Sequence, residues 1–326
     1  MFRVILVGSV TSSLVTLKSL IENNINVIGV LGYEPESEEN VSGYANMSLI
    51  CEAHKIPYFP FIKINDEKNI SLIKSLSPDI LFVVGLSQLV SHEILSISKM
   101  GNIGFHPTLL PRGRGRAPIA WLILEEKYGA ANFFLMGEGA DDGPVFIQEP
   151  FPVTEKDDAS TVEEKILSAI KTALNKWLPA LKDGEWNPVP QNELFATYYA
   201  KRSPDDGLIN WNNSSEEIDK LLRASTKPHP GAYSFLKNKK IRIWSSKKEK
   251  MLQIRGVTGR VLLVNNNKYL IQCGTGLLWI SSIKDESNNP IKLKIGQKLG
   301  YQIEDEIWKL KNEIESIKKC IQQKTF

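Results

Sequence analysis

The chain has 326 residues, of which 42% are hydrophobic and 24% are charged. This composition excludes a disordered chain and disfavours a membrane protein, and the length is sufficient for two domains with full cores. The net charge is only +3, but residues 201–300 hold 19 Lys and Arg against 8 Asp and Glu. This basic segment indicates either an anionic partner, such as RNA or a nucleotide diphosphate, or a lysine-rich solvated surface.

Apolar strand patterns alternate with helical patterns over the first 150 residues. The apolar runs lie at Phe2–Val7, Asn26–Gly32, Ile56–Phe61 and Ile80–Val84. This alternation predicts an α/β domain with a parallel sheet, helices on both faces, and ligands at the carboxyl ends of the strands. The turn after the first strand has Gly8 but no Gly-x-Gly-x-x-Gly pattern, so a nicotinamide-dependent dehydrogenase is disfavoured.

The pattern changes after a long predicted helix over Thr161–Leu181. Residues 184–205 have no periodicity and are expected to form a linker between residues 1–183 and a second domain at residues 206–300. Short apolar segments between Asn-rich and Gly-rich turns predict a small antiparallel barrel there. The predicted strands are Ile241–Trp244, Arg260–Val264, Tyr269–Cys273 and Leu277–Ile283.

Residues 301–326 form a separate segment with heptad spacing. Ile303, Ile307, Leu310, Ile314, Ile317 and Ile321 are separated by 4, 3, 4, 3 and 4 residues. This spacing predicts a helix with one apolar seam. Two interpretations remain open: the seam pairs with a second copy in a homodimer, or it packs on its own domain.

The cysteine usage and the amino-terminal residues bear on the compartment. Cys51, Cys273 and Cys320 have no metal-ligand spacing and are expected to be free thiols in a reducing compartment. The chain reads from Met1 directly into a short strand, which is too short for a secretory signal. We therefore expect a cytoplasmic protein that has no membrane association.

The residues best suited to catalysis lie on two loops. His106 follows an apolar strand and precedes a loop of proline, glycine and arginine that extends to Ile119. Asp141 and Asp142 lie on the glycine turn Gly139–Pro144. A histidine beside a carboxylate at strand ends is suited to moving a proton, although aspartate alone in such a turn is often only a turn former.

These two loops resemble those of formyltransferases that use 10-formyltetrahydrofolate. That family carries Asn-x-His-x-Ser/Thr-Leu-Leu-Pro followed by Arg-Gly and Pro, and a Gly-x-Asp-x-Gly turn; this chain has Gly104–Pro118 and Gly139–Gly143. The resemblance continues through Lys201–Trp211 and Pro228–Tyr233 to about residue 283. It implies a Rossmann-like catalytic domain, an OB-like second domain, and His106 and Asp141 as two of three catalytic residues.

The third catalytic residue of the family, an asparagine, is replaced here by Gly104. Attack on a formyl carbon creates an oxyanion that needs a hydrogen-bond donor. We expect a substitute to be protonated His106, a backbone N–H group, Asn102 on the same strand, or water. Gly104→Asn tests this expectation, because a large rise in turnover would show that no good substitute exists.

The resemblance also implies where the folate cosubstrate binds. The pocket is expected between the loop Gly85, Leu86, Ser87 and Gln88 and the turn that holds Gly139, Ala140 and Asp142. Glycine at a strand end is common, so the first of these loops is a weak signal by itself. No metal is expected.

Two acceptor amines remain in competition. The loop Gly32–Asn40 holds four glutamates, whereas relatives that act on methionyl-tRNA carry a basic loop there, so a nucleic acid is disfavoured. The segment Arg114–Trp121 resembles the formyltransferase half of a bifunctional enzyme that modifies UDP-4-amino-arabinose. We therefore expect a UDP- or dTDP-linked amino sugar from cell-surface glycan biosynthesis. Thr108, Arg114 and Arg116 are candidate substrate residues, and the two arginines are candidates for either diphosphate contacts or loop shaping.

Methionyl-tRNA is the second alternative, because the second domain is basic. A third alternative, which the missing asparagine favours, is an inactive module that still binds folate or a sugar nucleotide. The presence of both His106 and Asp141 argues for an active enzyme.

Overall fold

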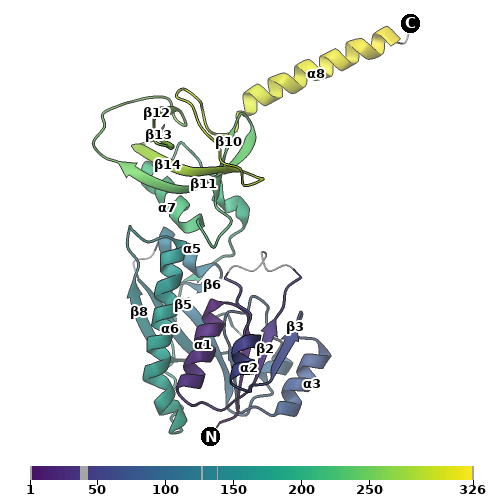
Figure 1. The fold of residues 1–326 in the computed structure, drawn as a ribbon, viewed down its shortest axis with the longest axis vertical. Coiled ribbons are helices and arrows are strands. Elements are labelled where there is room, and N and C mark those ends of the chain that lie inside the picture. Colours follow the sequence, from purple (N-terminus) through teal and green to yellow (C-terminus); the bar gives the residue numbers. More distant parts are fainter. Residues whose placement is uncertain (1, 37–42, 126–127, 138, 325–326) are drawn as a thin grey trace. The chain divides into compact units, whose positions relative to one another are not determined.

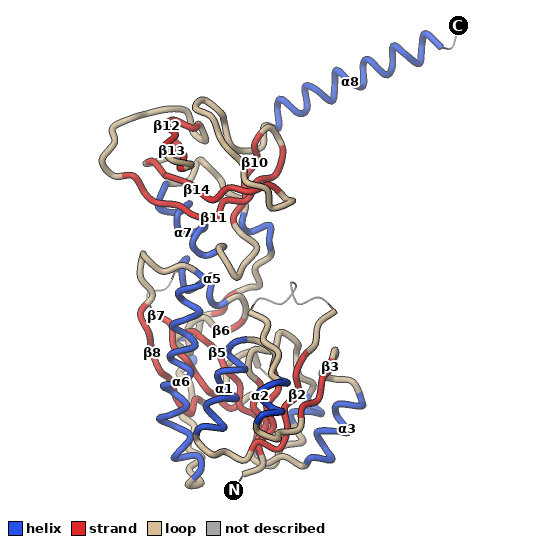
Figure 2. The backbone as a smooth tube through the Cα atoms, viewed as in Figure 1, coloured by secondary structure: helices blue, strands red, loops and turns tan. Residues whose placement is uncertain are grey.

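The computed structural model describes residues 2–36, 43–125, 128–137 and 139–324. The chain forms two compact units, Met1–Arg202 and Ser203–Phe326. Figure 1 shows the elements of each unit, and Figure 2 shows the same backbone coloured by secondary structure. Each unit is described separately below.

The first unit is built on a seven-stranded sheet with the order β3-β2-β1-β4-β5-β7-β8. The first five of these strands are parallel, and β7 and β8 are antiparallel to their neighbours. The predicted α/β fold with a largely parallel sheet is confirmed. The strands are β1 (Val4–Gly8), β2 (Val27–Tyr33), β3 (Tyr58–Phe61), β4 (Ile80–Val83), β5 (Gly101–Thr108), β7 (Tyr128–Leu135) and β8 (Val145–Pro152).

Six helices belong to the described part of this unit. They are α1 (Thr11–Glu22), α2 (Ser48–Ala53), α3 (Glu67–Leu76), α4 (His92–Leu95), α5 (Pro118–Leu124) and α6 (Ala159–Lys182). Helix α6 begins two residues before the predicted start, because Asp158 accepts a hydrogen bond from the backbone of Thr161 at 3.0 Å and caps the helix. Its Trp177 packs against Phe82 of β4 and Phe133 of β7, which fixes the helix on the sheet.

The second unit contains a five-stranded antiparallel sheet and the helix α7 (Ser215–Ser225). The helix packs on β11, and Ile218 and Leu222 enter the core of the unit. The buried core contains Trp211, whose indole N–H donates to Ser234 at 2.9 Å. The sheet order is β10 (Ala232–Leu236), β11 (Lys239–Glu249), β14 (Leu277–Asp285), β13 (Lys268–Gln272) and β12 (Val261–Asn265).

The heptad segment forms the helix α8 (Ile303–Lys324), coloured yellow in Figure 1. Its six seam residues are between 47% and 61% exposed, so the seam does not pack on its own unit. No helix within the described ranges combines the length and the apolar character needed to cross a bilayer.

The three cysteines, all inside the described ranges, are free thiols. Cys51 and Cys273 are buried, and burial raises the pKa of these thiols to about 11 and about 12. A buried thiol with a raised pKa is a poor nucleophile, because the thiolate is the reactive form. Cys320 lies exposed on α8.

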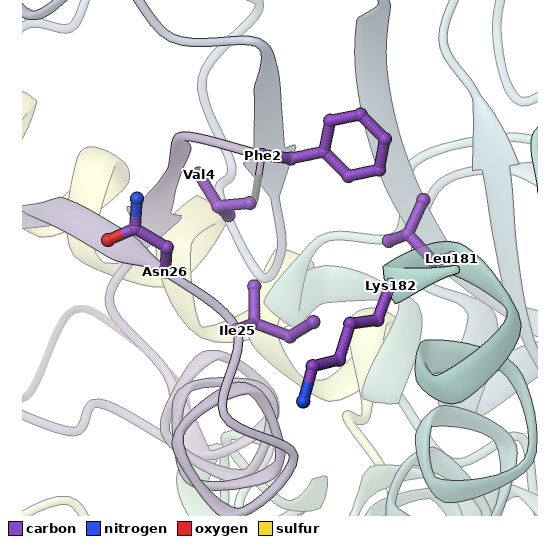
Figure 3. Close-up of a pocket in the computed structure, with 6 residues that line it drawn as sticks. All are labelled: Phe2, Val4, Ile25, Asn26, Leu181 and Lys182. Atoms are coloured by element: carbon purple, nitrogen blue, oxygen red, sulfur yellow. The ribbon is translucent and has the colours of Figure 1, made fainter. Parts of the chain in front are cut away.

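A shallow hollow lies at the amino end of β1 (Figure 3). It is lined by Phe2, Val4, Ile25, Asn26, Leu181 and Lys182. In parallel sheets ligands bind at the opposite, carboxyl ends of the strands. This hollow is therefore not the candidate site.

Candidate active site

His106, near the carboxyl end of β5, meets Asp141. The Nδ1 atom of His106 lies 3.2 Å from Oδ2 of Asp141. The same carboxylate oxygen accepts the backbone N–H of Gly115 at 2.9 Å. The His106 side chain is 5% exposed and the Asp141 side chain is 20% exposed. The carboxylate is therefore the more accessible end of the pair.

The second ring nitrogen of His106 is also occupied. Its Nε2 atom lies 2.8 Å from the carbonyl oxygen of Gly113. A carbonyl oxygen only accepts, so Nε2 carries a hydrogen and donates it. The proton that titrates is then the one between Nδ1 and Asp141. In this conformation both ring nitrogens therefore have protein partners.

Opposing influences act on the pKa of His106. Burial is the largest, and it lowers the pKa below the usual value because the imidazolium loses its hydration. The charge of Asp141 and the hydrogen bond to Gly113 act in the opposite direction. The net direction is downward, which favours the form of the pair that can accept a proton at neutral pH.

A buried amide holds the strand from which His106 projects. The side-chain NH2 of Asn132 on β7 donates to the carbonyl oxygens of His106 and Thr108 at 2.7 and 2.5 Å. Its own carbonyl oxygen accepts from Gln148 at 2.7 Å. The pairing of β5 with β7 shifts register at this point, and these bonds satisfy the carbonyl groups released there. Sequence reasoning missed Asn132, although a lone amide in an apolar strand was a usable signal.

The predicted linker contains a segment that closes over the loop after His106. Residues 191–199, here called the strap, include β9 (Tyr198–Tyr199), which pairs with β6 (Arg114–Gly115). The hydroxyl of Thr197 accepts from the backbone N–H of Gly113 at 2.9 Å, and its carbonyl accepts from that of Arg114 at 3.0 Å. The strap therefore fixes the backbone whose carbonyl contacts His106.

The strap also encloses Arg114, which is 0% exposed. Two guanidinium nitrogens donate to the carboxylate of Glu193 at 2.7 and 2.9 Å. Further bonds reach Gln191 at 3.0 and 3.2 Å and the hydroxyl of Tyr198 at 2.9 Å. The guanidinium thus serves the second of its two expected roles, loop shaping. Because it is buried among protein partners, it does not offer the expected contact to a diphosphate.

Gln191 links the strap to the acidic turn. Its side-chain NH2 group donates to the carbonyl oxygens of Asp141 and Gly143, both at 2.7 Å. The same amide accepts from Arg114 through its oxygen. One side chain therefore contacts both the loop that follows His106 and the turn that carries Asp141.

The position of the missing family asparagine is occupied by neighbouring side chains. A Cβ atom added at Gly104 would lie 2.7 Å from Cζ of Phe134 and 2.9 Å from Cγ of Met136. Asn102 is not a substitute donor, which corrects that expectation. Its amide is 3% exposed and bonds to Leu95 at 2.6 Å and Ser98 at 2.7 Å near the start of β5.

The other expected substrate residues differ in exposure. Thr108 is 1% exposed, and its hydroxyl donates to the carbonyl of Arg112 at 2.7 Å, so its side chain stabilises the loop. Thr108 is therefore not accessible for the expected direct contact with substrate. Arg116 is exposed next to Gly115, which binds Asp141. Arg116 is thus the accessible one of the two arginines.

The expected folate loop follows β4. Gly85 has φ +63, and a Cβ there would lie 2.2 Å from Val10, so glycine is required. Gln88 bonds to the backbone of Ile64 at 2.9 Å and of Ile62 at 2.7 Å, which fixes the loop. Leu86 packs on the core and Ser87 is exposed.

The turn on the other side of the expected folate pocket is more accessible. Gly139 and Ala140 are exposed, and the Asp142 carboxylate lies over Gly139.

Two of the four glutamates of the acidic loop, Glu38 and Glu39, lie outside the described residues.

Two family models cover most of the chain. Residues 4–178 match the model described as formyl transferase, and residues 201–295 match the formyl transferase C-terminal domain. The chain belongs to the formyl transferase family. The match to the first model contains both His106 and Asp141.

Individual relatives of this formyl transferase differ in how much they share with it. It is 33% identical over 258 residues to the bifunctional polymyxin resistance protein ArnA of Wigglesworthia glossinidia brevipalpis. That match covers 79% of this chain and 39% of ArnA, so the chain spans about two fifths of the length of this relative.

Solved structures share the fold at low identity. WlaRD, described as a sugar 3N-formyl transferase, has a TM-score of 0.63 and 16% identity, over 86% of this chain and 97% of its own. HypX of Aquifex aeolicus has a TM-score of 0.61 and 18% identity, over 90% of this chain and 47% of its own. Methionyl-tRNA formyltransferase of Clostridium thermocellum has a TM-score of 0.54 and 18% identity, over 76% of this chain and 94% of its own.

Proposed function

We propose that this formyl transferase moves a formyl group from 10-formyltetrahydrofolate to the primary amine of a UDP- or dTDP-linked amino sugar. The observation that carries this proposal is the contact between His106 and Asp141 near the carboxyl end of β5. An amine is an ammonium at neutral pH and attacks only after it loses a proton. A buried imidazole paired with a partly exposed carboxylate supplies the acceptor.

The geometry assigns different tasks to the two side chains. The ammonium proton passes to the pair through Asp141, because its carboxylate is the more exposed end. His106 shares that proton through Nδ1, while its Nε2–H stays on the Gly113 carbonyl. The amine nitrogen then bonds to the formyl carbon and loses its second proton, the bond from that carbon to the folate nitrogen breaks, and the folate nitrogen takes up the proton held by the pair. Backbone N–H groups or water stabilise the oxyanion, because Gly104 offers no side chain.

The folate is proposed to bind between the loop Gly85–Gln88 and the turn Gly139–Asp142. The first loop follows the parallel strand β4, at whose carboxyl side ligands of such sheets bind, and the turn reaches the same side through the contact of Asp141 with His106. The backbone of the first loop is held in place by Gln88, so its polar groups are preorganised. In support, WlaRD was solved with dTDP and 5-N-formyl-THF.

A sugar nucleotide is favoured over methionyl-tRNA for two reasons. The loop after β2 is acidic, and its described residues include Glu34 and Glu36, which repel a phosphate backbone. Sugar N-formyltransferases, including one from Shewanella sp. FDAARGOS_354 with a TM-score of 0.61, share the fold. The excess of Lys and Arg in residues 201–300 is the observation that keeps methionyl-tRNA as the second candidate.

The test is a formylation assay with purified protein and 10-formyltetrahydrofolate. The acceptors are a panel of UDP- and dTDP-amino sugars and, in parallel, methionyl-tRNA, with products detected by mass spectrometry. We expect a formylated sugar, and a loss of about 10²–10⁴-fold in kcat for both His106→Asn and Asp141→Asn. His92→Asn, on the exposed helix α4, serves as a control.

Each other outcome points to one of the alternatives. Formylation of methionyl-tRNA alone supports the second candidate. Binding of folate and nucleotide sugar without turnover supports the inactive module. Full activity in either pair variant contradicts the proposed role of the pair.

A further inference from the structure

Helix α8 presents an apolar face that its own unit does not cover. Ile303, Ile307, Leu310, Ile314 and Ile317 are 47–58% exposed, and Ile321 continues the spacing at 61%. The buried core of the second unit runs from Ile209 to Leu299 and stops before the helix. An amphipathic helix of this length gains most of its stability from packing its apolar face.

We propose that copies of this chain associate through α8 as a parallel coiled coil. The 4, 3, 4, 3, 4 spacing places Ile307, Ile314 and Ile321 at heptad position a and Ile303, Leu310 and Ile317 at position d. The two positions form one continuous apolar seam over three heptads. Every core position from 303 to 321 is Ile or Leu.

The flanking charges identify the occupant as a second copy in parallel orientation. Glu306 and Glu313 occupy position g, and Lys311 and Lys318 occupy position e. In a parallel coil each g residue faces the e residue five positions later on the partner, so both Glu–Lys pairs are attractive. An antiparallel coil would place g against g and e against e, which gives Glu–Glu and Lys–Lys contacts.

The core residues also indicate the number of strands. Isoleucine at both a and d favours three strands, whereas Leu at d favours two. Two of the three d residues here are Ile. We therefore assign a three-stranded coil.

The start of the helix is fixed on the second unit, because Asn238 accepts from the backbone of Gln302 at 3.2 Å and donates to Glu306.

The first experiment measures the mass of the full-length protein by sedimentation equilibrium. We expect about 110 kDa, three times the 36.7 kDa chain. Ile314→Asp places a charge in the seam and is expected to give the mass of one chain. Ser316→Asp, on the outer face of the same turn, is the matched control and is expected to keep the assembly. Both variants should leave the melting of the two units unchanged, because the helix lies outside their cores.

The second experiment tests orientation through charge. Glu313→Lys faces Lys318 of the partner and is expected to weaken association by about tenfold or more. The double variant Glu313→Lys with Lys318→Glu restores the attractive pair in a parallel coil only. Failure of the double variant to restore association overturns the parallel orientation.

Cross-linking gives an independent measure of register. Ile317→Cys in a Cys320→Ser background places two thiols at the same level of a parallel coil, and mild oxidation should join two chains. Ser316→Cys in the same background faces outward and should not cross-link. A wild-type chain that remains at 36.7 kDa at high concentration overturns the proposal. A sedimentation mass of only twice the 36.7 kDa chain supports self-association and overturns the three-stranded assignment.

Discussion

The side-chain oxygen of Gln191 accepts two hydrogen bonds from Arg114, at 3.2 Å from Nε and 3.0 Å from Nη2. The amide nitrogen of the same side chain donates to the backbone of Asp141 and Gly143. Gln191 therefore joins the loop that follows His106 to the turn that carries Asp141. It acts on the catalytic pair as a positioning residue.

Gln191→Leu removes both sets of bonds and should loosen the contact between His106 and Asp141. We expect kcat to fall about tenfold to a hundredfold, because small displacements of reacting groups reduce the rate steeply. KM should change less. Gln191→Glu keeps the acceptor for Arg114 and is expected to recover part of the loss, which steady-state kinetics will show. Gln253→Leu, an exposed site in the second unit, is the control. Unchanged kcat in Gln191→Leu would contradict the positioning role.

Arg114 and Arg116 are separated by one residue, Gly115, and should respond differently to substitution. Lysine cannot make the bidentate hydrogen bonds that Arg114 makes with Glu193. We therefore expect Arg114→Lys to lower the melting temperature by about 2–4 °C. Arg116→Ala should leave the melting temperature unchanged and raise KM for the nucleotide sugar. Thermal melting and steady-state kinetics of both variants measure this contrast. An unchanged KM in Arg116→Ala would remove Arg116 from substrate binding.

Gly104→Asn should not increase turnover. The new side chain would collide with Phe134 and Met136, and overpacking of this kind costs about 1–3 kcal/mol of unfolding free energy. Gly104→Asn with Phe134→Leu gives the amide more room and should recover stability. Denaturant unfolding and turnover are measured for both. A single variant with normal stability and higher kcat would show that the space is available.

The pH dependence should reflect the lowered pKa of His106. The pair accepts a proton above that pKa, so kcat/KM should stay constant through pH 6.5 and fall only at lower pH. In the unfolded chain the pKa of His106 returns to near its usual value of 6.5. At pH values between 6.5 and the lower folded pKa, the unfolded chain therefore binds more protons than the folded chain. Unfolding free energy should therefore decrease as pH falls from 6.5 toward the folded pKa. His106→Asn should reduce this slope. Denaturant unfolding at about pH 7.5 and about pH 5.5 compares the two proteins.

Much of the fold follows from local sequence patterns. The alternation of apolar runs and helical patterns was enough to predict the parallel sheet, because buried strands need continuous apolar residues. The two catalytic loops were located by their glycine, proline and charged residues at strand ends. The joint role of His106 and Asp141 was expected from the resemblance and not from strand order, because the turn with Asp141 follows β7, which runs antiparallel to β5.

The strap and the space at Gly104 depend on long-range pairing that local patterns do not encode. Arg114 is buried because Gln191 and Glu193, nearly eighty residues away, return to it. The side chain at Phe134 fills the space over Gly104 because β7 runs antiparallel to β5 in one particular register. A shift of one residue in that register would have turned Phe134 to the other face.

The position of the strap decides where the protein can be divided. A fragment that stopped at residue 183 would contain both catalytic side chains, yet Arg114 would lose Gln191, Glu193 and Tyr198. A buried guanidinium without acceptors is strongly unfavourable. Chimeras that exchange carboxyl-terminal halves between relatives should therefore be joined after Arg202, so that the catalytic half keeps its own closing segment.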